Sequence, residues 1–536
     1  MRLLSVRQMN DLEKQADIAG LSYERMMANA GKGLAVFIHD RFYGEGGKTI
    51  TGLVGSGNNG GDTLIALTHL SRLGWATRGY LIKERALGDG LVQGYLKTGG
   101  SMVSFSEDQD FKKLQLWTCK TDFLLDGILG TGTTLPLRGE ALEVLTFLSQ
   151  HKHSAKVIAV DCPSGVDCDG GEASEVSLKA DLTICMAAAK IGLINFPAFN
   201  FVGEISAIDI GLPDNLAGWK DVRGEVVSSE QVFSWLPERP LDGHKGTFGT
   251  CMVIAGSEPY CGAVILSSEA AYRVGAGLVQ AVIPENIYTA VAGQVPEAIW
   301  LKLPEDDGAI RSDAIALVKN HLTRKSVLLV GPGWGIGSNT GKFLENLLDL
   351  EMNKKNVYDK KLLKNHKNEV SEGFPAMVID ADAIKLLAAI PDWIKKIPPG
   401  SVLTPHPGEM SVLTGKSVDA IQSERIGNAV HYAREWGQTV VLKGACTLIA
   451  NADGDYTVIP LATSALSTAG TGDILAGMIA GLMAQGMKSY QAAIASAWLH
   501  AQAGYLAAER LGSERCVLAR DILKSLCDVL NKKTGH

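Results

Sequence analysis

Short runs of apolar and β-branched residues alternate with segments of helical periodicity along most of the chain. The runs that predict strands form two series: 49–54, 77–82, 123–125, 157–160 and 182–186, then 250–255, 278–283, 326–330, 376–379, 402–404 and 439–443. Helical segments such as 63–73 and 267–274 lie between them. This alternation is typical of parallel sheets with helices on both faces, so the pattern predicts an α/β fold.

The first series of strands ends near Pro213, and a segment without clear periodicity follows it. At 536 residues the chain is long enough for at least two domains. We therefore expect an N-terminal domain over 1–220, a linker over 221–241 and a C-terminal domain over 242–536. The lysine- and asparagine-rich stretch 353–372 interrupts the second series. It is interpreted as a surface insertion, with a partner-binding arm as the alternative.

Composition narrows the class of protein. Hydrophobic residues make up 46% and the net charge is -7, which fits a globular protein and argues against a basic nucleic-acid binder. The nine cysteines have no zinc spacing, as expected of reduced thiols in a cytoplasmic protein. Ser5 begins a helix-capping motif rather than a signal peptide. The longest apolar stretches, 474–484 and 492–508, are short or interrupted by His500 and Gln502, so no membrane partner is expected.

Glycine, at 60 residues, clusters where strands of the first half end. Residues 55–62 (GSGNNGGD) contain the GxGxxG pattern of dinucleotide-binding turns, and their asparagines and aspartate suit recognition of polar groups or ligation of a cation. Residues 126–133 and 160–167 place Asp126 and Asp161 after two further strands. Each segment read alone is also compatible with an ordinary turn or helix cap. Because ligands bind at the carboxyl ends of strands in open α/β sheets, the three segments together predict one shared site.

In the second half the most informative loop is Gly470-Thr471-Gly472-Asp473, which opens an apolar helix. Its backbone N–H groups and the helix dipole suit a phosphate, and Asp473 is placed to accept a proton from a hydroxyl. A simple N-cap is the alternative role for Asp473. With the upstream loops at 380–383 and 443–447, the pattern resembles ribokinase-like phosphotransferases, in which this aspartate activates the acceptor hydroxyl.

Longer motifs carry a more specific resemblance. GSGNNGGD, DGILGTGTTLP (126–136) and AVDCPSGVD (159–167) resemble the epimerase domain of bifunctional NAD(P)H-hydrate repair enzymes. HKGTFG, GPGWG, DADA, TPHPGEM, LKGACT and TAGTGDILAG, in this order, resemble the ADP- or ATP-dependent dehydratase domain of the same enzymes. The resemblance covers nearly the whole chain and implies a Rossmann-like three-layer domain followed by a ribokinase-like α/β domain.

The resemblance also implies two activities. The N-terminal domain would interconvert (R)- and (S)-NAD(P)HX, the hydrated forms of the reduced nicotinamide cofactors. The C-terminal domain would dehydrate the S form to NAD(P)H at the expense of ADP, giving AMP and phosphate, with ATP as the other possible donor. The expected partners are thus NADHX, NADPHX and the nucleotide, and a homo-oligomer is expected. A vitamin-type kinase fused to a dehydrogenase-like domain and a nucleotide-binding scaffold without turnover are the alternatives.

Residue roles follow from the same resemblance. Asp161 and Asp473 would be catalytic, and Cys162 inert. Potassium would be held by Asn59, Asp126 and Ser164, and magnesium would accompany ADP. The N-terminal contacts to the hydrate would be Asn58, Asn59, Gly60, Gly61, Asp62, Gly130, Thr131, Gly132, Thr133, Thr134, Leu135, Pro136 and Asp161. The C-terminal contacts to the hydrate would be Ala263, Gly333, His406 and Asp473, with a satisfied turn histidine as the alternative for His406. The nucleotide would be lined by Lys443, Gly444, Ala445, Cys446, Thr447 and Gly472.

Overall fold

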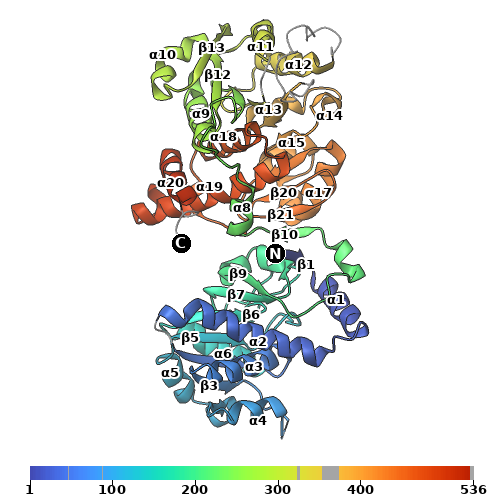
Figure 1. Cartoon of the computed structure of the whole chain (residues 1–536), viewed down its shortest axis with the longest axis vertical. Coiled ribbons are helices and arrows are strands. Elements are labelled where there is room, and N and C mark those ends of the chain that lie inside the picture. Colours follow the sequence, from blue (N-terminus) through green and yellow to red (C-terminus); the bar gives the residue numbers. More distant parts are fainter. Residues whose placement is uncertain (46–47, 87, 323–325, 353–373, 532–536) are drawn as a thin grey trace. The chain divides into compact units, whose positions relative to one another are not determined.

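The computed structural model describes residues 1–45, 48–86, 88–322, 326–352 and 374–531 (Figure 1). The chain divides into two compact units, Met1–Val226 and Val227–His536. Each unit is built on a sheet of mostly parallel strands, which confirms the predicted α/β class. The lysine-rich stretch 353–372 lies outside the described residues.

The first unit contains a parallel sheet in the order β4-β3-β2-β5-β6-β7-β9. Its strands are β2 (Thr49–Val54), β3 (Ala76–Leu81), β4 (Ser101–Ser104), β5 (Phe123–Gly127), β6 (Lys156–Val160), β7 (Leu182–Met186) and β9 (Glu204–Ile208). From β2 the chain adds strands on one side, and from β5 onward it adds them on the other. The strand order therefore reverses between β2 and β5, the place where open α/β sheets bind ligands.

Alternate residues of these strands belong to two separate cores. Ile50, Leu125 and Ile158 pack in the core that includes residues of α2 and α3, whereas Leu53 and Leu124 pack in the core that includes residues of α5 and α6. This period of two makes the unit three-layered, as predicted. Its helices are α1 (Val6–Ile18), α2 (Tyr23–Phe42), α3 (Asn58–Arg72), α4 (Gly90–Leu96), α5 (Lys112–Thr118), α6 (Gly139–Gln150) and α7 (Phe199–Val202).

The second unit is also built on a mostly parallel sheet, with the strand order β13-β12-β11-β16-β17-β18-β19-β20-β21. Pairing is parallel from β13 to β19 and antiparallel from β19 to β21. The strands are β11 (Thr250–Ile254), β12 (Leu278–Pro284), β13 (Ile299–Leu303), β16 (Val327–Val330), β17 (Ala376–Ile379), β18 (Val402–Leu403), β19 (Thr439–Leu442), β20 (Leu448–Ala450) and β21 (Tyr456–Val458). Here the order reverses between β11 and β16, so this edge is the expected ligand site.

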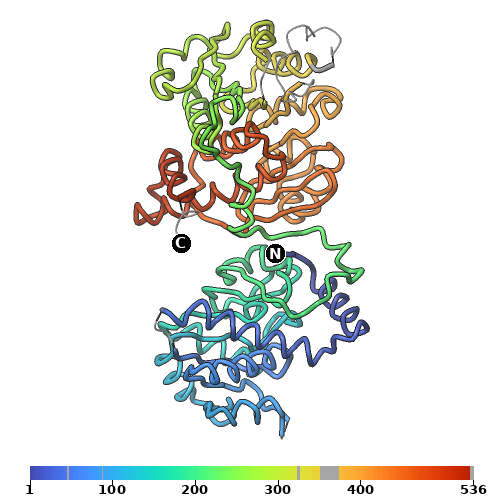
Figure 2. Tube along the Cα trace, in the orientation of Figure 1, coloured from blue at the N-terminus to red at the C-terminus, as the bar shows by residue number. Residues whose placement is uncertain are grey.

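Helix α18 (Thr471–Ala484) is buried on almost all sides, which explains why its sequence is apolar without an amphipathic stripe. It packs closely against α9 (Gly262–Arg273), far earlier in the chain, and against α19 (Ser489–Leu511) (Figure 2). The other helices of this unit are α8 (Ser229–Trp235), α10 (Tyr288–Val291), α11 (Ile315–His321), α12 (Ser338–Met352), α13 (Asp382–Leu387), α14 (Trp393–Lys396), α15 (Pro407–Thr414), α16 (Val418–Ser423), α17 (Arg425–Trp436) and α20 (Ala519–Asn531).

Differences from the predicted elements are concentrated at helix starts. Helix α3 begins at Asn58 and α9 at Gly262, earlier than the predicted 63 and 267, because glycine and asparagine in the first turns weaken the helical signal. The segment 221–241 contains β10 (Gly224–Val226) and α8, which are too short to show a periodic pattern. The smaller strands are β1 (Arg2–Leu4), β8 (Ala189–Lys190), β14 (Glu305–Asp306) and β15 (Ala309–Ile310). Within the described ranges, no helix combines the length and hydropathy that a bilayer span requires.

Candidate active sites

In the first unit, the predicted polar loop forms the opening turns of α3, directly beyond β2. Gly60 allows this start, because a Cβ there would lie 1.9 Å from the backbone oxygen of Gly55. Gly130, after β5, lies against Asn59 in the same way, since its Cβ would be 3.0 Å from the Asn59 Oδ1. Thr133 closes that loop by donating through Oγ1 to the Gly130 oxygen at 2.8 Å. The two predicted segments therefore meet at the reversal of strand order.

The three predicted potassium ligands lie together. Asn59 Nδ2 donates to the backbone oxygens of Leu129 (2.8 Å) and Val160 (2.6 Å). Ser164 donates to Asp126 from its backbone nitrogen at 2.9 Å and from Oγ at 2.5 Å. Asp126 is fully buried, and among the described residues no ion pair involves it. Burial raises the pKa of Asp126, and the hydrogen bonds from Ser164 offset only part of this rise. A set of oxygen ligands that includes a single carboxylate without an ion-pair partner suits a monovalent cation.

Asp161 follows β6 with a left-handed φ of 65°. It accepts from the Met186 backbone nitrogen at 2.9 Å and forms an ion pair with Lys190. Lys190 is fully buried, and the charge of Asp161 raises its pKa in spite of burial. The sequence analysis missed Lys190. Its signal was available, because it is the one charged residue in the apolar run 182–194.

Asp62 is a second carboxyl group in the neighbourhood of Asp161. Its Oδ1 is buried and has no hydrogen-bond partner. Burial raises the pKa of Asp62 to about 8, and the negative charges of Asp161 and Glu13 add to the effect. The site therefore contains a carboxylate paired with lysine and a carboxylic acid that keeps its proton near neutral pH.

In the second unit, a cavity of about 570 Å³ lies where the strand order reverses between β11 and β16. It is lined by three predicted residues, Ala263, Gly333 and Asp473. It is also lined by Asp382, from the predicted loop 380–383, and by residues that the sequence analysis missed, among them Tyr260, Leu266, Ile336 and Lys385. Gly333 is required here, because it has a φ of 65° and a Cβ would lie 2.8 Å from that of Ala263.

Asp473 stands in the first turn of α18, facing this cavity. The N-cap position belongs to Gly470, with a φ of 91°, and no side chain caps the helix, so Asp473 is not the N-cap. Burial raises the pKa of Asp473 to about 7, the charge of Asp380 adds to the rise, and Lys443 opposes it. A carboxyl group that titrates near neutral pH is well matched to general base catalysis.

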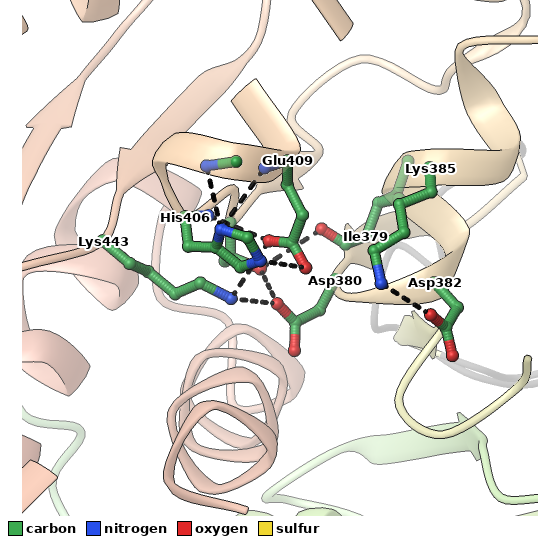
Figure 3. Close-up of polar contacts among 9 residues, drawn as sticks. Ile379, Asp380, Asp382, Lys385, His406, Glu409 and Lys443 are labelled. Atoms are coloured by element: carbon green, nitrogen blue, oxygen red, sulfur yellow. Dashed lines mark hydrogen bonds and ion pairs between the residues drawn. The ribbon is translucent and has the colours of Figure 1, made fainter. Parts of the chain in front are cut away.

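Lys443 lies at the centre of a charged cluster at the ends of β17, β18 and β19 (Figure 3). Its Nζ is 2.7 Å from Asp380 Oδ1 and 3.6 Å from Glu409 Oε2. The pKa of Lys443 is raised, because these carboxylates outweigh the opposing effect of burial. A Cβ on Gly472 would lie 3.7 Å from Nζ, so the predicted residues Lys443 and Gly472 are brought together at the start of α18.

His406 makes a local contact at the start of α15, and its predicted contact with the hydrate stays a prediction. Its Nδ1 accepts from the backbone nitrogens of Gly408 (3.0 Å) and Glu409 (3.3 Å), which caps α15. Burial lowers the pKa of His406, and the positive charges of Lys443 and Lys385 lower it further. His406 is not among the residues that line the cavity.

The rest of the predicted nucleotide loop leaves β19 in a tight turn. Thr447 Oγ1 donates to the Gly444 oxygen at 2.8 Å, and the buried Cys446 has a φ of 50°. Arg425, which the sequence analysis missed, lies beside Gly444 and donates to the Leu442 oxygen at 3.2 Å. Burial lowers the pKa of Arg425. Arg425 of α17 thus adds a second positive charge beside the loop that begins at Lys443. Cys162, predicted to be inert, is buried, and its thiol pKa is raised by a hydrogen bond with Cys168 and by burial.

Together, the seven-stranded sheet defines a Rossmann-like unit, and the second sheet with its cavity beside α18 defines a ribokinase-like unit. Residues 251–527 match the family described as NAD(P)H-hydrate dehydratase, and residues 23–192 match that described as YjeF-related protein N-terminus. The chain belongs to the bifunctional NAD(P)H-hydrate repair enzymes, which confirms the resemblance of its motifs.

Two relatives of that name show the extent of the match. The protein of Moorella thermoacetica is 33% identical over 94% of this chain and 92% of its own length. That of Coxiella burnetii is 32% identical over 98% of both chains. A solved structure of ADP/ATP-dependent NAD(P)H-hydrate dehydratase from Bacillus subtilis, co-crystallised with ATP and Mg²⁺, is 26% identical and covers 57% of this chain and 98% of its own, with a TM-score of 0.47.

Proposed function

We propose that the first unit interconverts (R)- and (S)-NAD(P)HX, and that the second unit dehydrates the S form to NAD(P)H with ADP as the phosphoryl donor. The observation that carries the proposal is Asp473, a carboxyl group with a pKa of about 7, facing a cavity at the start of a helix whose N-terminus has no side-chain cap. Family membership supports the pairing of the two activities in one chain.

In the second unit, Asp473 takes the proton of the C6 hydroxyl of the hydrate while that oxygen attacks the terminal phosphorus of ADP. The P–O bond to AMP breaks, and the backbone N–H groups at the start of α18 stabilise the charge on the transferring group. The phosphorylated hydrate then loses phosphate, because the ring nitrogen donates its electron pair and C5 gives up a proton. Hydrate and ADP thus become NAD(P)H, AMP and phosphate, with all atoms accounted for.

Lys443 is suited to the nucleotide side of this reaction. Its charge lies against Gly472 and is fixed by Asp380, so it can neutralise phosphate oxygens without blocking Asp473. Among the described residues no group of three His, Cys, Asp or Glu could hold a metal ion. Magnesium would therefore be held mainly by the nucleotide phosphates, where it would supply charge neutralisation.

In the first unit, epimerisation at C6 requires the reversible loss and return of water there. Asp62 keeps a proton that it can give to the leaving hydroxyl, and Asp161 can take a proton from the water that returns. Asn59, Asp126 and Ser164 would hold potassium, which would balance the buried charge of Asp126.

The experiment that tests the dehydratase proposal labels the C6 hydroxyl of (S)-NADHX with oxygen-18. After incubation of the protein with ADP and Mg²⁺, we expect one AMP for each NADH formed and the label in inorganic phosphate, read by mass spectrometry. Label in water would mean that the hydroxyl leaves directly, without phosphorylation. A stable phosphorylated product without NADH would favour a small-molecule kinase instead.

A further inference from the structure

The predicted residues that line the cavity beside Asp473 provide no positive charge for a negatively charged substrate. The hydrates that it would bind are dinucleotides with a pyrophosphate, and NADPHX has a 2′-phosphate as well. Ala263 and Gly333 are neutral, and Asp473 and Asp382 are acidic. Among the described residues that line the cavity, Lys385 is the one positively charged side chain.

Lys385 is held at the cavity by an ion pair with Asp382, which is itself fixed by a hydrogen bond. Its Nζ is 3.0 Å from Asp382 Oδ1, and Asp382 is itself fixed because its Oδ2 accepts from the Gly335 backbone nitrogen at 2.8 Å. The Asp382 side chain is mostly buried, whereas that of Lys385 is 41% exposed. A lysine has three N–H donors, so the ion pair with Asp382 leaves donors for a ligand.

We infer that Lys385 binds a phosphate group of the dinucleotide hydrate and so determines how tightly the dehydratase unit holds its substrate. This inference rests on the proposed function. The half-exposed ammonium meets the phosphate at the mouth of the cavity, while the hydrated ring reaches Asp473 inside it. The predicted nucleotide residues Lys443, Cys446 and Gly472 are not among the residues that line this cavity, so Lys385 is assigned to the hydrate rather than to the nucleotide donor.

The contrast between substrates identifies which phosphate is bound. NADHX and NADPHX share the pyrophosphate and differ in the 2′-phosphate. If Lys385 meets the pyrophosphate, its loss weakens both hydrates equally, and if it meets the 2′-phosphate, its loss weakens NADPHX selectively. Both results support the inference.

The test compares steady-state dehydration of (S)-NADHX and (S)-NADPHX by the full-length protein and by Lys385→Ala and Lys385→Arg. We expect Lys385→Ala to raise KM for one or both hydrates about tenfold or more, the usual effect of losing one charge-assisted hydrogen bond, and to leave KM for ADP within about twofold. Lys385→Arg should restore most of the affinity. The wild-type KM for the hydrate should rise with salt, and that of Lys385→Ala should rise less.

Lys395 provides a matched control, because it forms an ion pair with Asp392 at 2.9 Å with the same spacing of three residues but does not line the cavity. Lys395→Ala should leave both hydrate KM values unchanged. An unchanged hydrate KM in Lys385→Ala, or an equal rise in the KM for ADP, would overturn the inference. A wild-type protein that forms no NADH from the hydrate would instead refute the proposed function.

Discussion

The pH dependence of dehydration gives the sharpest test of the role of Asp473. Its pKa of about 7 is raised from 3.8, so the base form is lost as the pH falls through neutrality. If this form is required, kcat should fall about tenfold for each pH unit below 7 and level off above 8. Asp473→Asn should lower kcat by at least about 10²-fold, the usual contribution of a general base. The assay is NADH absorbance at 340 nm with saturating ADP and (S)-NADHX.

Neighbouring charges should move this profile in opposite directions. Asp380 raises the pKa of Asp473 and Lys443 lowers it. Asp380→Asn should therefore shift the acid limb to lower pH, and Lys443→Gln should shift it to higher pH. Asp521, which stands in the first turn of α20, is the matched control, and Asp521→Asn should leave the profile unchanged. A flat profile between pH 5.5 and 8, or shifts in the wrong direction, would refute the assignment of Asp473.

Three further predictions concern the first unit. Asp161→Asn should abolish epimerisation and leave dehydration of pure (S)-NADHX intact. Chiral chromatography of the remaining hydrate would show this result. Loss of both activities in folded protein would contradict two separate sites. Replacing potassium by tetramethylammonium should lower the epimerisation rate of the wild type, whereas the Asp126→Asn variant should be slow in both salts. Equal wild-type rates in the two salts would refute the proposed cation site. Lys190→Met should lower the free energy of unfolding by about 3–5 kcal/mol, because it leaves Asp161 as an unpaired buried charge. In urea unfolding, the double variant Lys190→Met with Asp161→Asn should regain most of that loss.

Much of the fold was predictable because the buried strands of a parallel sheet form apolar runs that are visible in the sequence. The predicted strands 49–54 and 376–379 coincide with β2 and β17. The starts of α3 and α9 were not predicted, because glycine and asparagine in their first turns weaken the helical signal. In α3, Gly60 is there for close packing against the backbone of Gly55. Within the sites, Asp161 and Asp473 were marked by motifs. Lys385 and Tyr260 were not, because their proximity to Asp473 depends on strand order and not on spacing along the chain.

The two sites share one electrostatic arrangement and use it differently. In each unit a lysine forms an ion pair with a carboxylate, Lys190 with Asp161 and Lys443 with Asp380, and Lys443 also lies 3.6 Å from Glu409. Burial raises the pKa of a second carboxyl group in each site, and the charge of the paired carboxylate adds to the rise, so the pKa values are about 8 for Asp62 and about 7 for Asp473. In the dehydratase unit the unpaired carboxyl is the proposed catalytic base. In the epimerase unit the proposed base is the paired Asp161, so Asp62 must supply the proton. The two activities should therefore respond oppositely to pH near 8, where Asp473 is active and Asp62 begins to lose its proton.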